Sequence, residues 1–160
     1  MHRRSRNGPD HYSVNQRTKF GVADGIYLVG GAALVVSAFL SWVARGPGSG
    51  LRGHDLVDTV VALGNNVPAL SAGRLTILWY LIPALGAASW IAFGLVGARS
   101  PAARVIAGAG ALMATLTFGA FVRLVGWDRL GWGPKVAFLG GIALVLGAWL
   151  PLRKNASAGL

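Results

Sequence analysis

Four long stretches without charged residues limit the possible folds of this chain more than any other feature of its sequence. They cover about 25–44, 75–97, 105–125 and 136–152, and the third is free of charge until Arg123, near its end. A helix needs about 20 mainly apolar residues to cross the hydrocarbon core of a membrane. No apolar stretch remains outside them for a separate soluble core. The sequence therefore predicts an all-α membrane protein, an antiparallel bundle of four transmembrane helices.

The overall composition favours the same class. The 160-residue chain is 54% hydrophobic and 12% charged, whereas ordinary soluble domains carry about 25% charged residues. Such a chain has too little polar surface to stay in water as a folded body. The first apolar stretch is also longer than that of a signal peptide, so we expect it to remain as a membrane anchor.

The basic residues predict the side of the membrane that each connection faces. Nine of them lie in the two tails and in the link between the second and third stretches, and six lie on the other side. Basic residues accumulate on the cytoplasmic side, so we expect a multi-pass membrane protein with both termini on that side. The expected parts are a disordered basic tail (1–20), a transmembrane domain (21–152) with a long outer loop (45–74), and a C-terminal tail (153–160).

The net charge of +10 also raises the question of nucleic-acid binding. Such binding usually needs a clustered basic face and a recognisable module. Here the charges separate the apolar stretches, as topology signals do, so we expect no nucleic-acid partner. The expected partners are membrane lipids and other integral membrane subunits.

Small residues in the third stretch predict a face for close helix packing. Inside a membrane, helices associate through small residues that let two backbones approach each other. A stripe of them recurs every four residues: Ala103, Ala107, Ala111, Thr115 and Gly119. Two interpretations stay open, since this face either packs inside the bundle or docks a helix of a partner subunit.

The outer loop carries a second candidate feature. After the sequence "GPGSG" at 46–50, Asp55 is expected to be the N-cap of a short amphipathic helix, and Asp58 lies in its first turn. His54 beside them suggests a metal or proton site as the alternative. Metal sites usually need three or four ligands, and the chain has no Cys, no Glu and three His. We therefore interpret His54, Asp55 and Asp58 as cap and contact residues, and expect no metal.

Missing residue types limit the chemistry further. No histidine lies in an apolar stretch to hold haem, and no ionisable residue lies deep within one to couple ions to transport. The chain lacks the phosphate loop and the nucleophile motifs of common enzymes. We therefore expect neither a cofactor nor an enzymatic activity.

The stretches "FLSWV" (39–43) and "GHDLVD" (53–58) carry a resemblance. With the four apolar stretches, they make the chain similar to small four-span membrane proteins of unknown function from high-G+C Gram-positive bacteria. Several such proteins are accessory subunits of larger envelope or respiratory assemblies. The resemblance thus implies a non-catalytic accessory subunit of an inner-membrane complex, first of all a transport assembly, including one for lipids. The alternatives are a supernumerary subunit of a respiratory complex and a small independent carrier.

Overall fold

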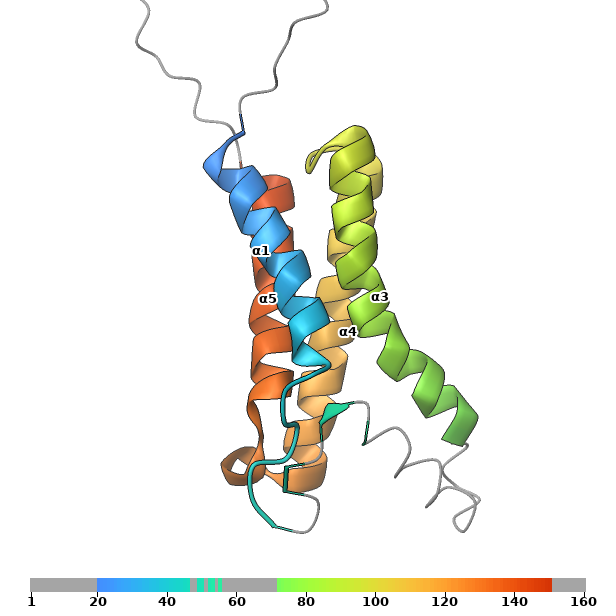
Figure 1. Ribbon diagram of the computed structural model, residues 1–160, viewed down its shortest axis with the longest axis vertical. Helices are drawn as coiled ribbons and strands as arrows, with labels where there is room; N and C mark the ends of the chain where they lie inside the picture. The colour runs from blue at the N-terminus through green and yellow to red at the C-terminus, as the bar shows by residue number, and fades with distance from the viewer. Residues whose placement is uncertain (1–19, 47–48, 51, 54, 56–71, 151–160) are drawn as a thin grey trace, which may run out of the picture.

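The computed structural model describes residues 20–46, 49–50, 52–53, 55 and 72–150. In these ranges the regular structure is helical, with no β-strand. The elements are α1 (Val22–Ser37), α3 (Ala72–Val96), α4 (Pro101–Val125), the 3-10 helix η1 (Trp127–Arg129) and α5 (Trp132–Trp149) (Figure 1). The all-α prediction is confirmed for this part of the chain. The tails, apart from Phe20, and the outer-loop helix beyond Asp55 lie outside the described residues.

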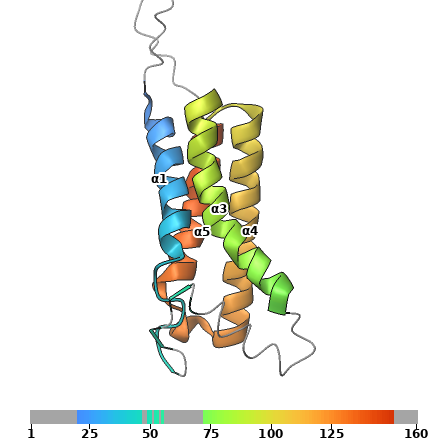
Figure 2. The same ribbon diagram turned by 45° about the vertical axis from the view of Figure 1, so that its right-hand side comes forward.

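The four α-helices form an antiparallel bundle (Figures 1 and 2). α1 packs against α3 and α5, and α4 packs against the same two helices from the other side. One end of the bundle, the terminal end, holds the start of α1, the α3–α4 turn (97–100) and the end of α5. The opposite end, the loop end, holds residues 38–46 and 126–131. The first and last described residues therefore lie at the same end.

Glycines end the two longest helices. Gly97 follows α3 with a φ of 80°, and Gly126 follows α4 with a φ of 82°. Other residue types rarely adopt this left-handed backbone, and glycine adopts it freely. The chain can therefore reverse direction within a few residues at both points.

α1 ends earlier than the apolar sequence predicts. A continuous helix over 25–44 is wrong, because α1 stops at Ser37 and residues 41–44 are extended. The extended chain finds other partners: the N–H groups of Gly131 and Gly133 donate to the Trp42 and Ser41 carbonyls, both at 2.9 Å. Ala44 N–H in turn donates to the Arg129 carbonyl at 2.8 Å. Long-range hydrogen bonds to the α4–α5 connection thus replace the last helical turns.

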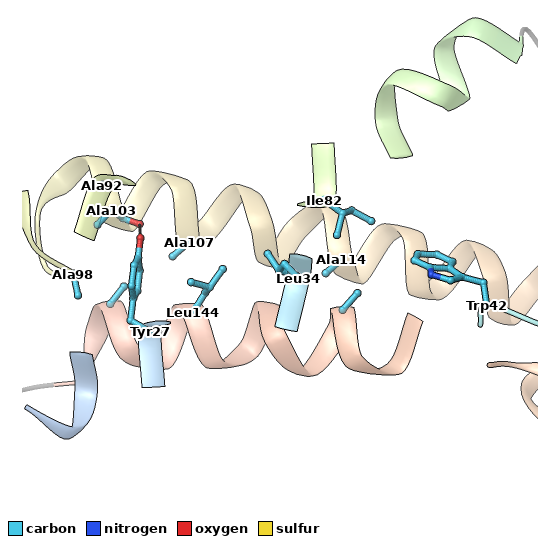
Figure 3. Packing of buried hydrophobic residues seen from close by; sticks show 12 residues of the cluster. Tyr27, Leu34, Trp42, Ile82, Ala92, Ala98, Ala103, Ala107, Ala114 and Leu144 are labelled. Carbon is cyan, nitrogen blue, oxygen red and sulfur yellow. Dashed lines mark hydrogen bonds between the residues drawn. The ribbon is translucent and has the colours of Figure 1, made fainter. Parts of the chain in front are cut away.

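Small residues fill the interior of the bundle, with a few large side chains between them (Figure 3). A Cβ atom added to Gly30 would lie 2.6 Å from the backbone nitrogen of Leu144, and one added to Gly147 would lie 2.5 Å from that of Tyr27. The backbones of α1 and α5 are therefore nearly in contact. The large buried residues are Tyr27, Leu34, Trp42, Ile82 and Leu144. Small residues at helix contacts are typical of bundles held together in lipid.

α3 is the least regular helix of the bundle. Pro83 lies inside it and has no N–H, so the carbonyl four residues earlier lacks its helical donor. In both views the N-terminal part of α3 leans away from the other helices (Figures 1 and 2). This departure begins in the part of the helix that contains the proline.

Two helices are long and apolar enough to cross a membrane. They cover 101–123 in α4 and Trp132–Trp149 in α5, while Val22–Ser37 and 80–96 are shorter apolar helices. A core helix of a soluble protein can pass the same test, but such a helix is mostly buried. Only 17% of the α4 segment is buried inside the bundle. The α5 segment is 44% buried, so by length, composition and exposure the two helices favour a membrane protein over a soluble core.

Candidate membrane and partner interface

The predicted small-residue face of α4 divides between the inside and the outside of the bundle. Ala103 and Ala107 are fully buried, and Ala111 is half-buried, its Cα 2.9 Å from where a Cβ on Gly141 would lie. Thr115 and Gly119 are exposed. Residues four apart advance by about 40° beyond a full helical turn, so the stripe rotates by about 160° along its length. It is therefore two surfaces rather than one face.

The inward surface of α4 follows the true helical period. Gly110 and Ala114 are buried and continue the line that begins with Ala103 and Ala107. The spacings of four, three and four residues keep these positions within one side of an α-helix. A search for this mixed spacing in the sequence would have found the internal face, and it would also have identified Gly30 on α1, which we did not predict.

The outward surface of α4 is an apolar strip with a glycine at each end. It comprises Gly108, Leu112, Thr115 and Gly119, which share one side of the helix at spacings of four, three and four. A Cβ atom on Gly108 or Gly119 would meet no atom within 4 Å. The Thr115 hydroxyl donates to the Ala111 carbonyl at 2.7 Å, so its polar group is satisfied within the helix. Another backbone could approach α4 closely at the two glycines of this strip.

Tryptophan side chains and basic groups lie together at both ends of the bundle. At the loop end, Lys135 Nζ lies 5.6 Å from the ring centroids of both Trp127 and Trp132. At the terminal end, the Arg104 guanidinium lies 5.9 Å from the ring centroid of Trp149. These rings are half or more exposed. Tryptophan and basic residues favour the two interfaces of a membrane, so this pattern fits a bundle that spans one.

Between these ends the outer surface is apolar on all four helices. In the described chain, no charged residue lies within 25–44, 80–98, 105–122 or 136–150. Large side chains point outward over this band: Val29, Val36, Ile91, Leu95, Val105, Leu112, Leu116, Leu139, Ile142 and Leu146. A continuous apolar surface of this kind marks a membrane or protein contact.

Trp42 closes the loop end of the bundle. Its sequence position suggests the membrane interface, but its side chain is fully buried. The indole N–H donates to the Ser37 carbonyl at 2.8 Å, and the ring meets Phe121 edge-on, with centroids 4.8 Å apart. Any side chain on Gly133 would collide with the indole. Trp42 thus caps α1 and holds the α4–α5 connection against it.

Asp55 is the described member of the predicted outer-loop site. Gly53 and Asp55 are helical, and an Asp55 carboxylate oxygen accepts the Arg52 N–H at 3.1 Å. The carboxylate therefore caps the N–H group three residues before it, and Asp55 is not itself the N-cap; Asp24 does the same for the Gly21 N–H in α1 at 2.8 Å. His54 and Asp58 lie outside the described residues.

The two buried serine hydroxyls of the described chain bond within their own helices. Ser37 donates to the Leu34 carbonyl at 2.7 Å, and Ser89 donates to the Gly86 carbonyl at 2.6 Å. Among the described residues, no group of three metal-ligating side chains comes together. The described interior offers packing surfaces rather than reactive groups.

Comparison of the chain with protein families, with curated proteins and with solved structures finds no match.

Proposed function

We propose that the chain is a multi-pass integral membrane protein in which all four α-helices cross the bilayer. The support is the apolar outer band bounded by Trp–cation pairs at both ends. α1 has 16 residues, about 24 Å of helix, whereas the hydrocarbon core is about 30 Å thick. The extended chain at 41–44 continues the path toward the loop end. Irregular backbone is tolerated at membrane depth when protein covers it, and Trp42 and Val43 are buried.

Within this membrane, we propose a non-catalytic accessory subunit of a larger inner-membrane complex. The observation that carries the proposal is the contrast between the two sides of α4. The inward small residues pack against α1, α3 and α5. The outward strip consists of Gly108, Leu112, Thr115 and Gly119, and a Cβ atom on either glycine would meet no atom within 4 Å. Close backbone approach at small residues is what holds membrane helices together.

The resemblance to small four-span proteins of high-G+C Gram-positive bacteria supports the choice of complex. It favours a transport assembly of the bacterial inner membrane, including one that moves lipids, with both termini in the cytoplasm. The basic residues of the sequence support that orientation.

The experiment enlarges the outward strip while leaving the bundle intact. Gly108→Leu and Gly119→Leu together would hold a partner helix away, because each leucine would project from a glycine that now meets nothing within 4 Å. We expect the double variant to keep its thermal midpoint in detergent and to lose its partners on gentle purification from the native host. The matched control is Gly94→Leu on α3, since Gly94 is also exposed and meets nothing within 4 Å.

Two outcomes contradict this proposal. If the double variant retained every copurifying subunit, the strip would face lipid alone. If it lost partners only together with a lower midpoint, the strip would be needed for folding instead of docking.

A further inference from the structure

A lysine and two tryptophans form a cluster on the outside of the loop end, the loop-end cluster. Lys135 Nζ lies over the Trp127 ring of η1 and over the Trp132 ring of α5, 5.6 Å from each centroid. At this distance an ammonium is attracted to the face of an indole. The two rings are 60% and 68% exposed, so the cluster is open to whatever surrounds the bundle.

Contacts between the helices fix the elements that carry the cluster. The Trp127 ring meets Phe118 of α4 edge-on, with centroids 5.8 Å apart, and Phe118 stacks on Phe138 of α5 at 4.8 Å. The first turn of α5 is held by the Gly133 N–H, which donates to the Ser41 carbonyl at 2.9 Å. A ligand would therefore meet groups that are already in place, which lowers the cost of binding.

The polar groups of the cluster have no acceptor in the described part of the chain. No ion pair joins Lys135 to an acid there, although Asp128 is next to Trp127 in the sequence. The indole N–H of the buried Trp42 donates to a carbonyl, whereas the indoles of Trp127 and Trp132 donate to no described group. One ammonium and two indole N–H groups are thus left for a ligand that carries acceptors.

An apolar track leads from the cluster toward the middle of the bundle. Leu139, Ile142 and Leu146 follow Lys135 along α5 at spacings of four, three and four residues, which keeps all four on one side of the helix. The three apolar side chains are exposed. From Lys135 to Leu146 the helix rises about 16 Å, close to half of the hydrocarbon thickness of about 30 Å. A ligand that fits both parts has an anionic head and an apolar chain about one leaflet long.

We propose that the loop-end cluster binds the phosphate of an anionic phospholipid, and that one acyl chain of this lipid lies along Leu139, Ile142 and Leu146. The proposal rests on the membrane embedding proposed above. Basic residues attract anionic headgroups, and tryptophan favours the level of the headgroups. Because Lys135 occupies the faces of both rings, these faces are not available to the quaternary ammonium of phosphatidylcholine. The cluster should therefore prefer a headgroup that carries no cation.

The test measures the thermal midpoint of the purified full-length chain in a neutral detergent. The probes are phosphatidylglycerol, phosphatidylcholine with the same acyl chains, and glycerol phosphate, which has the phosphate but no acyl chain. We expect phosphatidylglycerol to raise the midpoint more than phosphatidylcholine does at the same concentration. Glycerol phosphate should have little effect when it is compared with sodium chloride at equal ionic strength.

Substitutions separate a specific site from general attraction to a basic protein. In Lys135→Gln the apparent affinity for phosphatidylglycerol should fall about fivefold, the usual effect of one basic residue near an anionic surface. Lys135→Arg should keep most of the affinity, because the charge and the ring contacts remain. Trp132→Ala should weaken binding about two- to fivefold, since a cation–π contact of ordinary strength holds the ammonium in place. Without lipid, Lys135→Gln and Trp132→Ala should melt within a few degrees of the wild type.

The matched control is Arg129→Gln. Arg129 lies at the same end, is exposed, and lies over no aromatic ring among the described residues. This variant loses the same charge as Lys135→Gln and should bind phosphatidylglycerol as the wild type does.

Four results would overturn the proposal. Wild-type affinity in Lys135→Gln, or an equal loss in Arg129→Gln, would leave only general electrostatic attraction. Equal stabilisation by phosphatidylcholine would remove the preference for an anionic headgroup, and equal stabilisation by glycerol phosphate would leave the apolar track without a role. Cysteine labelling in intact cells tests the membrane embedding separately, so a failure of this site is distinguishable from a failure of the spanning arrangement.

Discussion

The contact between α1 and α5 at Gly30 yields the most quantitative prediction. In Gly30→Ala the new Cβ would lie 2.6 Å from the Leu144 nitrogen and 2.8 Å from the Gly140 oxygen, whereas ordinary contacts begin at 3.4 Å. Both neighbours are backbone atoms, so the helices must separate by about 0.8 Å there. Overpacking of this kind costs about 1–3 kcal/mol, and the better helix propensity of alanine returns about 0.5–1 kcal/mol. The expected net loss is about 1 kcal/mol at the middle of these ranges and about 2.5 kcal/mol at most, a range that the expected midpoint decrease of roughly 1–8 °C largely covers.

The assay is thermal unfolding in detergent, followed by far-ultraviolet circular dichroism. For a chain of this size, 1 kcal/mol moves the midpoint by about 2–4 °C, so we expect a decrease of roughly 1–8 °C. The control is Gly94→Ala on α3, where a Cβ meets nothing within 4 Å and the midpoint should stay the same or rise slightly. A Gly30→Ala variant as stable as Gly94→Ala would refute the close approach of α1 and α5.

Two further predictions concern the ends of α1. Trp42→Ala removes a fully buried indole and should destabilise the chain by about 3–5 kcal/mol, while Trp132→Ala, whose side chain is 68% exposed, should change the same midpoint little. Asp24→Asn weakens the carboxylate contact to the Gly21 N–H and should cost about 0.5–1 kcal/mol, measured as the unfolding free energy in detergent; a gain in stability would contradict the cap.

Local sequence patterns were sufficient to predict the approximate places of the α-helices that the structure describes. The apolar stretches at 75–97, 105–125 and 136–152 correspond to α3, α4 and α5 within a few residues. Each lies between glycines, prolines or charged residues, which are signals that a single helix carries in its own sequence.

The end of α1 could not be predicted in the same way. The apolar run continues to Ala44 without a helix-breaking residue, so no local signal stops the helix at Ser37. What stops it is a set of hydrogen bonds to Gly131 and Gly133, which lie about 90 residues later in the chain. Only the folded bundle brings these groups beside Trp42.

The small-residue face of α4 was predicted only in part, because we took the repeat of its residues as four. The true period of 3.6 residues leaves Ala103 inside and Gly119 outside, so the stripe combines an internal contact with an outer surface.

The most direct test of the central claim, that four helices cross the membrane, is the labelling of single cysteines in intact cells with an impermeant thiol reagent. The chain contains no cysteine of its own, so Gly8, Gly50, Ala102 and Asp128 can each be replaced in turn. We predict labelling from outside at Gly50 and Asp128, and labelling at Gly8 and Ala102 only after the cells are made permeable. Labelling of Gly8 and Gly50 from the same side, or of Ala102 and Asp128 from the same side, would contradict the four-span bundle.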